Sequence, residues 1–337
     1  MKSVKMNGEQ YMGKAEMARH RSVYSSMLEA DELDKCHLSN FLWNYPILKN
    51  YPGILGFEGA FKNIPAVLVG SGPSLECNMR LLKEYSKKML IIAGDAALPV
   101  LVNKLGIYPH IVVMGDPTEK QKENFKGIDT TKFLTVCATV AHPAIFRTVD
   151  PQHLCVYNVR SNSTLSEMIP YHTGRKGGLP AGVLTSGSVF GFAAMTGANP
   201  VTFIGHDLSW PTPDKMYAQG VAQYKHSFQK AVKFKSDCLL FPDINGKLVL
   251  THSTFINFYI WLHDAIPRIS TKIFNSSESG ILKMKHLAVM PFKKWIDKFC
   301  KYDLVGIEER ISVALNYQFK DGLVEKILLP KLKGTKA

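Results

Sequence analysis

The sequence lacks the markers of several protein classes. Its six cysteines form no CxxC pair, and histidines and cysteines are not clustered at the spacing of metal ligands. The N-terminus has no apolar core of a secretory signal. The most apolar stretch, residues 183–205, is interrupted by Asn199 and Pro200, which predicts a buried helix and strand rather than a membrane span. These absences predict a cytoplasmic protein in a reducing compartment.

Several catalytic and binding signatures are also missing. The chain contains no nucleophile elbow, no HExxH motif and no kinase signature. It also has no RNP-like motif, zinc finger or helix-turn-helix signature, so it carries no specific sign of nucleic-acid binding. What it does have is positive charge, with a formal net charge of +13. This excess favours acidic partners such as nucleotides or sugar phosphates, without choosing among them.

One stretch, residues 65–75 (PAVLVGSGPSL), organises the rest of the chain. Its apolar start predicts a buried parallel strand, and the glycines predict a tight turn with backbone angles that a side chain would forbid. We expect Ser74 to cap the helix that follows, over residues 76–88. Such a turn presents free N–H groups to an anion. The residues expected to hold a phosphate are Gly70, Ser71, Gly72, Pro73 and Ser74. The motif is neither GxGxxG nor a Walker A loop, so a βα turn without a ligand is the alternative.

Short apolar strands alternate with helical segments in the middle of the chain. The expected strands are residues 65–69, 89–93, 110–114, 132–138, 154–157 and 201–204, and a helix is expected over residues 97–105. This alternation predicts an α/β fold, with a mostly parallel sheet and helices on both faces.

Three of the expected strands end in Gly-Asp or Gly-His-Asp, which places Asp95, Asp116 and Asp207 at their carboxyl ends. Ligands of open α/β sheets bind at that edge, and carboxylates there contact sugar hydroxyls or a metal. Each Asp alone could be a turn or cap residue, but together they predict a nucleotide-type site. His206, beside Asp207, is the best placed of the histidines for a catalytic base, although a lone histidine is more often structural.

Further candidates follow later in the chain. Ser186, Gly187 and Ser188 precede a helix of small residues and predict a second anion pocket. The preceding loop carries Arg175 and Lys176, which can close over a diphosphate or a carboxylate, or can be incidental surface charge.

The polar segment 209–237 resembles a lid or an acceptor-binding region. Residues 243–246 predict the turn of a hairpin, and an apolar helix is expected over residues 254–266. A short strand over residues 272–274 runs into a polar turn. In that turn Asn275 and Glu278 are candidate substrate contacts.

Because carboxylates and phosphate loops occur without covalent machinery, the chemistry that fits is group transfer from an activated phosphate donor. We expect three parts: a helical N-terminal extension over residues 1–62, a catalytic domain over 63–290 and a basic helical segment over 291–337. The N-terminal extension is interpreted as packing against the main domain, with a partner-binding arm as the alternative.

The motifs together resemble a known family. GSGPSL at residues 70–75, the strand-end Asp95 and Asp116, SGSV at 186–189 and IGHDLSW at 204–210 resemble the MptE-like domain. DINGKLVLT at 243–251 and NSSESG at 275–280 resemble it too. This domain forms the centre of the motility accessory factor (Maf) proteins and occurs in archaeal 6-hydroxymethylpterin diphosphokinase. The resemblance spans residues 63–291 and implies a Rossmann-like fold.

The resemblance implies transferase activity of one of two kinds. Maf proteins are thought to transfer nonulosonic acids from CMP donors to flagellin, whereas the archaeal enzyme transfers diphosphate from ATP to a pterin with Mg²⁺. By the resemblance, residues 70–74 would hold the donor phosphate, and Asp95 and Asp116 would contact ribose, base or metal. Residues 186–188 would bind the anionic part of the donor, and Asp207 would face the reacting centre.

The sequence departs from the family in two respects. His206 stands where the family often has Gln, and the chain is short for a Maf protein, whose flanking regions are usually larger. We favour a metal-independent glycosyltransferase that uses a CMP-activated nonulosonic sugar, with Arg175 and Lys176 binding the sugar carboxylate. The alternatives are a diphosphokinase, with Mg²⁺ on Asp95 and Asp116, and a scaffold without catalysis.

Overall fold

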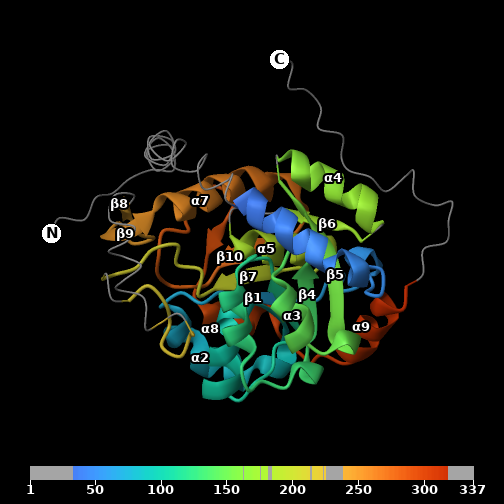
Figure 1. Cartoon of the computed structure of the whole chain (residues 1–337). Coiled ribbons are helices and arrows are strands. Elements are labelled where there is room, and N and C mark those ends of the chain that lie inside the picture. Colours follow the sequence, from blue (N-terminus) through green and yellow to red (C-terminus); the bar gives the residue numbers. More distant parts are fainter. Residues whose placement is uncertain are drawn as a thin grey trace.

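The structure, a computed structural model, describes residues 33–161, 163–174, 176–180, 184–212, 215–222, 224 and 238–317 (Figure 1). Its centre is a nine-stranded sheet in the order β11-β10-β7-β1-β2-β3-β4-β5-β6, and all of its pairings are parallel. The strands are β1 (Ala66–Val69), β2 (Leu90–Gly94), β3 (Ile111–Met114), β4 (Leu134–Ala138), β5 (Leu154–Arg160), β6 (Gly178–Pro180), β7 (Val201–Ile204), β10 (Ile273–Asn275) and β11 (Ala288–Val289). The predicted α/β fold is confirmed.

Helices cover both faces of the sheet because successive residues of a buried strand point to opposite sides. In β1, Val67 and Val69 pack with one set of helices, α2 and α8, whereas Ala66 and Leu68 pack with α5 and α7. The helices are α2 (Leu75–Glu84), α3 (Pro143–Thr148), α4 (Thr164–Thr173), α5 (Thr185–Met195), α7 (Ser253–Ala265), α8 (Phe292–Phe299) and α9 (Ile307–Leu315).

The strand order places a crevice beside β1. From β1 to β6 the chain moves outward to one edge of the sheet, and β7 then returns to the other side of β1. The register pairs Val69 with Ala93 of β2 and with Ile204 of β7, so the three strands end at the same level. The strand order therefore reverses between β1 and β7, which is where open α/β sheets bind ligands.

The segment predicted as a helix over residues 97–105 is helical, but it is not a regular α-helix. The 3₁₀ turn η3 (Asp95–Ala97) runs through the α-helical Leu98 and Pro99 into the π-helix η4 (Val100–Lys104). Pro99 has no N–H to donate, so the hydrogen-bond pattern of a regular α-helix is not continued through it. The predicted hairpin is confirmed, with β8 (Cys238–Pro242) and β9 (Leu248–His252) pairing antiparallel.

The described parts of both flanks are helical, as expected. A helix over residues 33–48, drawn in blue in Figure 1, contacts the segments that follow β3 and β4. There the Asn40 amide donates to the carbonyls of Pro117 and Val140, and the Asn44 amide donates to Thr139 and Ala141. At the other end of the chain, α8 packs against α2, and α9 packs against the 3₁₀ turn η1 (Ile54–Phe57). Both flanks thus complete the cores of the sheet.

Two regions of interest for function lie partly or wholly outside the described residues. These are most of the expected lid, at residues 213–214, 223 and 225–237, and the first 32 residues. In the part that is described, none of the helices is long and apolar enough to cross a membrane.

Candidate functional site

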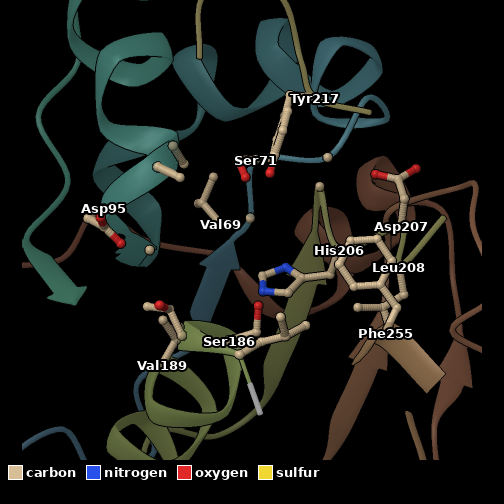
Figure 2. A pocket seen from close by; sticks show the side chains of 18 of the residues that line it. Val69, Ser71, Asp95, Ser186, Val189, His206, Asp207, Leu208, Tyr217 and Phe255 are labelled. Carbon is tan, nitrogen blue, oxygen red and sulfur yellow. The ribbon is translucent and has the colours of Figure 1, made fainter. Parts of the chain in front are cut away.

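A cavity of about 230 Å³ opens at the carboxyl ends of β1, β2, β3 and β7 (Figure 2). The strand-end residues that line it are Val69–Gly72, Gly94–Ala97, Asp116 and Gly205–Ser209. The other lining residues are Gln121, Leu184, Thr185, Ser186, Val189, Met216, Tyr217 and Phe255. The tertiary structure thus brings together the glycine loop, the three strand-end carboxylates, His206 and Ser186.

The two glycines of the loop after β1 are required by lack of space. A Cβ at Gly70 would lie 2.4 Å from the Gly205 carbonyl oxygen, and a Cβ at Gly72 would lie 2.1 Å from Asp207 Oδ2. Neither glycine has a positive φ, so the expectation of special backbone angles was wrong. The glycines are needed because the loop after β7 packs directly against the loop after β1.

The expectation that Ser74 caps α2 was also wrong. Ser74 is the N-cap residue by position, but its side chain makes no capping hydrogen bond. Instead its hydroxyl donates to Asp207 Oδ2 at 2.8 Å, and its backbone N–H donates to the same oxygen at 3.2 Å. A carboxylate of the protein therefore occupies the N-terminus of α2, where an anionic ligand was predicted.

Asp207 is buried and its backbone is held on several sides. Its carbonyl accepts hydrogen bonds from the Ile281 N–H at 2.9 Å and from the Ser209 hydroxyl at 3.2 Å. The next residue, Leu208, has φ +51°, a conformation that is uncommon for a side chain of this kind. Burial raises the pKa of Asp207 to about 6, against the hydrogen bonds from Ser74. The carboxyl group therefore exchanges its proton near neutral pH.

His206 lies at the centre of the cavity wall (Figure 2). Its Nδ1 lies 3.1 Å from the Ile204 carbonyl, which can only accept, so Nδ1 carries the proton and Nε2 is the acceptor in the neutral ring. Burial lowers the pKa of His206 to about 4. At neutral pH the imidazole is thus an uncharged hydrogen-bond acceptor and only a weak base, whereas Asp207 is the stronger one.

Asp95 and Asp116 line the side of the cavity formed by β2 and β3. Asp95 Oδ2 accepts a hydrogen bond from the Asn124 amide at 2.8 Å, and Asp116 Oδ1 accepts one from the Thr118 N–H at 2.8 Å. Burial, with a contribution from the charge of Asp116, raises the pKa of Asp95 to about 7. No group of three or more His, Cys, Asp or Glu side chains suited to a metal occurs among the described residues. The two carboxylates could hold an ion only together with ligands from water or substrate.

The raised pKa of Asp95 predicts a pH-dependent stability. The unfolded chain releases this proton near pH 3.8 and the folded chain near pH 7, so ionisation destabilises the fold as the pH rises through that window. Asp95→Asn removes this penalty. We expect its free energy of unfolding, relative to wild type, to increase by about 4 kcal/mol between pH 4 and pH 8, because each unit of the pKa difference between the folded and unfolded chain corresponds to about 1.4 kcal/mol. Urea unfolding across this range measures it, and an equal effect of the substitution at all pH values would contradict it.

The start of α5 contributes one of the three residues expected there. Ser186 lines the cavity, together with Thr185, and its hydroxyl makes no hydrogen bond within the described part of the chain. Ser188 is buried and donates to the Pro180 carbonyl at 2.9 Å, and Gly187 is buried as well. Of the polar residues expected at the start of α5, Ser186 alone therefore faces the cavity.

The three candidate substrate contacts that the structure describes do not line the cavity. The Lys176 ammonium donates to the Tyr51 carbonyl. The Asn275 amide donates to the Leu282 carbonyl at 2.8 Å and accepts from the Ser277 N–H at 2.9 Å. Glu278 accepts from the Asn78 amide and the Phe292 N–H. These polar groups therefore bond to other parts of the protein. Pro73 of the glycine loop does not line the cavity either. Arg175 lies outside the described residues.

No sequence motif predicted three of the side chains that line the cavity. Gln121 comes from the 3₁₀ segment η5 (Glu119–Phe125), Tyr217 from the segment after β7, and Phe255 from the first turn of α7. The Phe255 ring packs edge-on against Trp210, with 5.7 Å between the centroids. Their positions depend on loops and on a helix start, for which no motif exists. Tyr217 and Phe255 add aromatic rings to the lining of the cavity.

The described lining contains three carboxylates, several hydroxyl groups and no Lys or Arg. Hydroxyls, carboxylates and aromatic rings are suited to binding polyhydroxylated ligands such as ribose or a sugar. Two of the carboxyls, Asp95 and Asp207, titrate near neutral pH and can accept or release a proton during a reaction.

Comparisons with known proteins show which structures and which family this chain is similar to. A search of solved structures finds the Maf glycosyltransferase from Magnetospirillum magneticum AMB-1, with a TM-score of 0.59 and 15% sequence identity. The alignment covers 84% of this chain and 41% of that one, so the present chain spans less than half of the length of this neighbour. At 15% sequence identity, this similarity shows that the two chains share a fold. No curated protein matches the chain.

The family model described as MptE-like, 6-hydroxymethylpterin diphosphokinase MptE-like, matches residues 39–213, just over half of the sequence. The match begins within the helix over residues 33–48, upstream of residue 63, and it includes the glycine loop, the three strand-end aspartates and the start of α5. The resemblance is thereby confirmed over the matched residues, the motifs at residues 243–251 and 275–280 lie beyond them, and the chain belongs to the MptE-like family.

Proposed function

We propose that this protein is a glycosyltransferase that moves a sugar from a nucleotide-activated donor to a hydroxyl group of an acceptor. The observation that carries the proposal is the position of Asp207, a buried carboxyl with a pKa near 6, at the switch point of the sheet. A base that ionises just below neutral pH is suited to accept a proton from an acceptor hydroxyl. The shared fold of a Maf glycosyltransferase supports this choice.

The step that we propose is a displacement at the anomeric carbon of the sugar. The acceptor oxygen forms a bond to that carbon while the bond from the carbon to the donor phosphate oxygen breaks. The nucleotide leaves with the electron pair, and the acceptor proton moves to the Asp207 carboxylate. We propose a CMP-activated nonulosonic acid as the donor, following the motif resemblance, and a protein such as flagellin or a glycan as the acceptor.

The donor phosphate is expected at the start of α5. Thr185 and Ser186 there offer hydroxyls and the free N–H groups of a helix N-terminus, and Ser71 adds a hydroxyl from the opposite loop. The N-terminus of α2 is less suited to this role because Asp207 already occupies it. Asp95 and Asp116 are placed to accept hydrogen bonds from the ribose or the base.

A diphosphokinase is the second candidate, because the description of the matching family model names that activity and two carboxylates lie together at the cavity. In that case Asp95 and Asp116 would hold Mg²⁺ through water and the phosphates of ATP. A binding protein without catalysis is the third reading.

Calorimetry with CMP, CDP, UDP and ATP, with and without Mg²⁺, separates these functions. We expect CMP to bind in the absence of Mg²⁺, because the proposed transfer needs no metal. Ser186→Ala is expected to weaken this binding, with Ser312→Ala, on α9, as the matched control outside the cavity. Binding of ATP only with Mg²⁺ would favour the diphosphokinase, and binding of none of the four would favour the scaffold.

A further inference from the structure

The contact between Ser74 and Asp207 indicates a role for Ser74 other than binding phosphate. Ser74 is 4% exposed and does not line the cavity. Within the described part of the chain its hydroxyl makes one hydrogen bond, to Asp207 Oδ2. Its N–H donates to the same oxygen, so both donors of one residue converge on a single carboxylate oxygen.

We propose that Ser74 is a positioning residue for Asp207: it holds one oxygen of the carboxylate and so fixes the orientation of the group that accepts the proton of the acceptor. The assignment rests on the proposed function, because Ser74 acts only through Asp207. Hydrogen bonds to an ionised acceptor are shorter and stronger than bonds between neutral groups. The pair therefore favours the charged form of Asp207, which is the form that can act as a base.

A purely structural role for the hydroxyl has little support in the contacts. It makes no capping bond to α2, so its removal leaves the helix hydrogen bonds intact. The turn before the helix is closed by backbone bonds, from the Leu75 N–H to the Gly72 carbonyl and from the Glu76 N–H to the Pro73 carbonyl. The fold of the loop therefore does not depend on the Ser74 side chain.

The titratable groups around Asp207 carry no positive charge. Hydrogen bonds are therefore the main interactions that stabilise its ionised form. The charge of Asp207 acts on the Cys77 thiol of α2, and the other titratable groups near it, the neighbouring His206 with Asp95 and Asp116, line the same cavity. None of these is a cation at neutral pH, since burial keeps His206 neutral. Besides Ser74, the side chain of Ser279 also lowers the pKa of the Asp207 carboxyl.

The test compares wild type with Ser74→Ala and Ser74→Thr in the full-length protein. Turnover of a CMP-activated sugar is measured as a function of pH, and the pKa of the Asp207 carboxyl is measured by carbon NMR in the absence of substrate. We expect Ser74→Ala to move the acidic limb of the pH–rate profile and the carboxyl titration upward by about one pH unit. Ser74→Thr keeps the hydroxyl and is expected to restore both.

Other results would overturn the assignment. A higher donor KM with an unchanged pH profile would mean that Ser74 contacts the donor, and a lower Tm with no shift in either titration would mean a structural role. The NMR titration also separates this proposal from the proposed function. If wild type turns over no donor, the transferase proposal fails, whereas an unshifted carboxyl in Ser74→Ala refutes the positioning role by itself.

Discussion

Asp207→Asn is expected to lower turnover by at least about 100-fold, the contribution typical of a positioned general base, with little change in donor binding. Asparagine has nearly the shape of aspartate, and its side-chain oxygen can still accept the hydrogen bonds from Ser74. It cannot take up the acceptor proton. The measurement is the steady-state rate with a CMP-activated sugar, alongside calorimetric affinity for CMP. A rate within a few-fold of wild type would remove Asp207 from the reaction.

The same substitution is expected not to destabilise the fold at high pH. The Asp207 carboxyl has a pKa of about 6 in the folded protein and an ordinary value of 3.8, so its ionisation destabilises the fold above that window and not below it. Asp207→Asn is therefore expected to be at least as stable as wild type at pH 8, with the difference shrinking toward pH 4. Asp129→Asn, at a half-exposed carboxylate bonded to Thr131, is the control: it is expected to leave turnover unchanged and to show the opposite pH dependence, because the hydrogen bonds from Thr131 lower the pKa of Asp129.

Gly72→Ala is expected to destabilise the protein by about 3 kcal/mol and to abolish nucleotide binding, since overpacking in a rigid site typically costs 1–3 kcal/mol or somewhat more. The added methyl would lie 2.1 Å from Asp207 Oδ2 and 2.7 Å from the Gly205 carbonyl oxygen. Either the loop after β1 or the loop after β7 must move, and both loops line the cavity. Urea unfolding and calorimetry measure the two effects.

Gly94→Ala provides the control for this prediction. Gly94 also lies at a strand end and lines the cavity, but a Cβ there would have no neighbour nearer than 4.0 Å. Its φ of −71° and ψ of 146° suit alanine. We expect wild-type stability in this variant. Equal destabilisation by both substitutions would show that the close approach between the two loops is not the cause.

The sequence by itself determined the fold class and the edge of the sheet where the site lies. Short buried strands such as Ala66–Val69 and Val201–Ile204 are uncharged and apolar on both faces, and this pattern occurs in parallel sheets covered by helices. The strand-end positions of Asp95, Asp116 and Asp207 follow from the local pattern alone. In a parallel sheet these positions share one edge, so the cavity that joins them was predictable.

The roles of individual side chains were decided by the tertiary structure. Nothing near Ser74 in the sequence indicates that its partner is Asp207, 133 residues away, because that contact depends on β7 returning to the side of β1. The return of β7 to the side of β1 also explains why residue 72 is a glycine, because the loops after these two strands leave no space for a Cβ there. Asn275 lies at a strand end as Asp207 does, but its amide is used by the turn that follows it. A strand end is a local property that a sequence pattern records, whereas the partner of a polar group depends on which distant backbone folds against it.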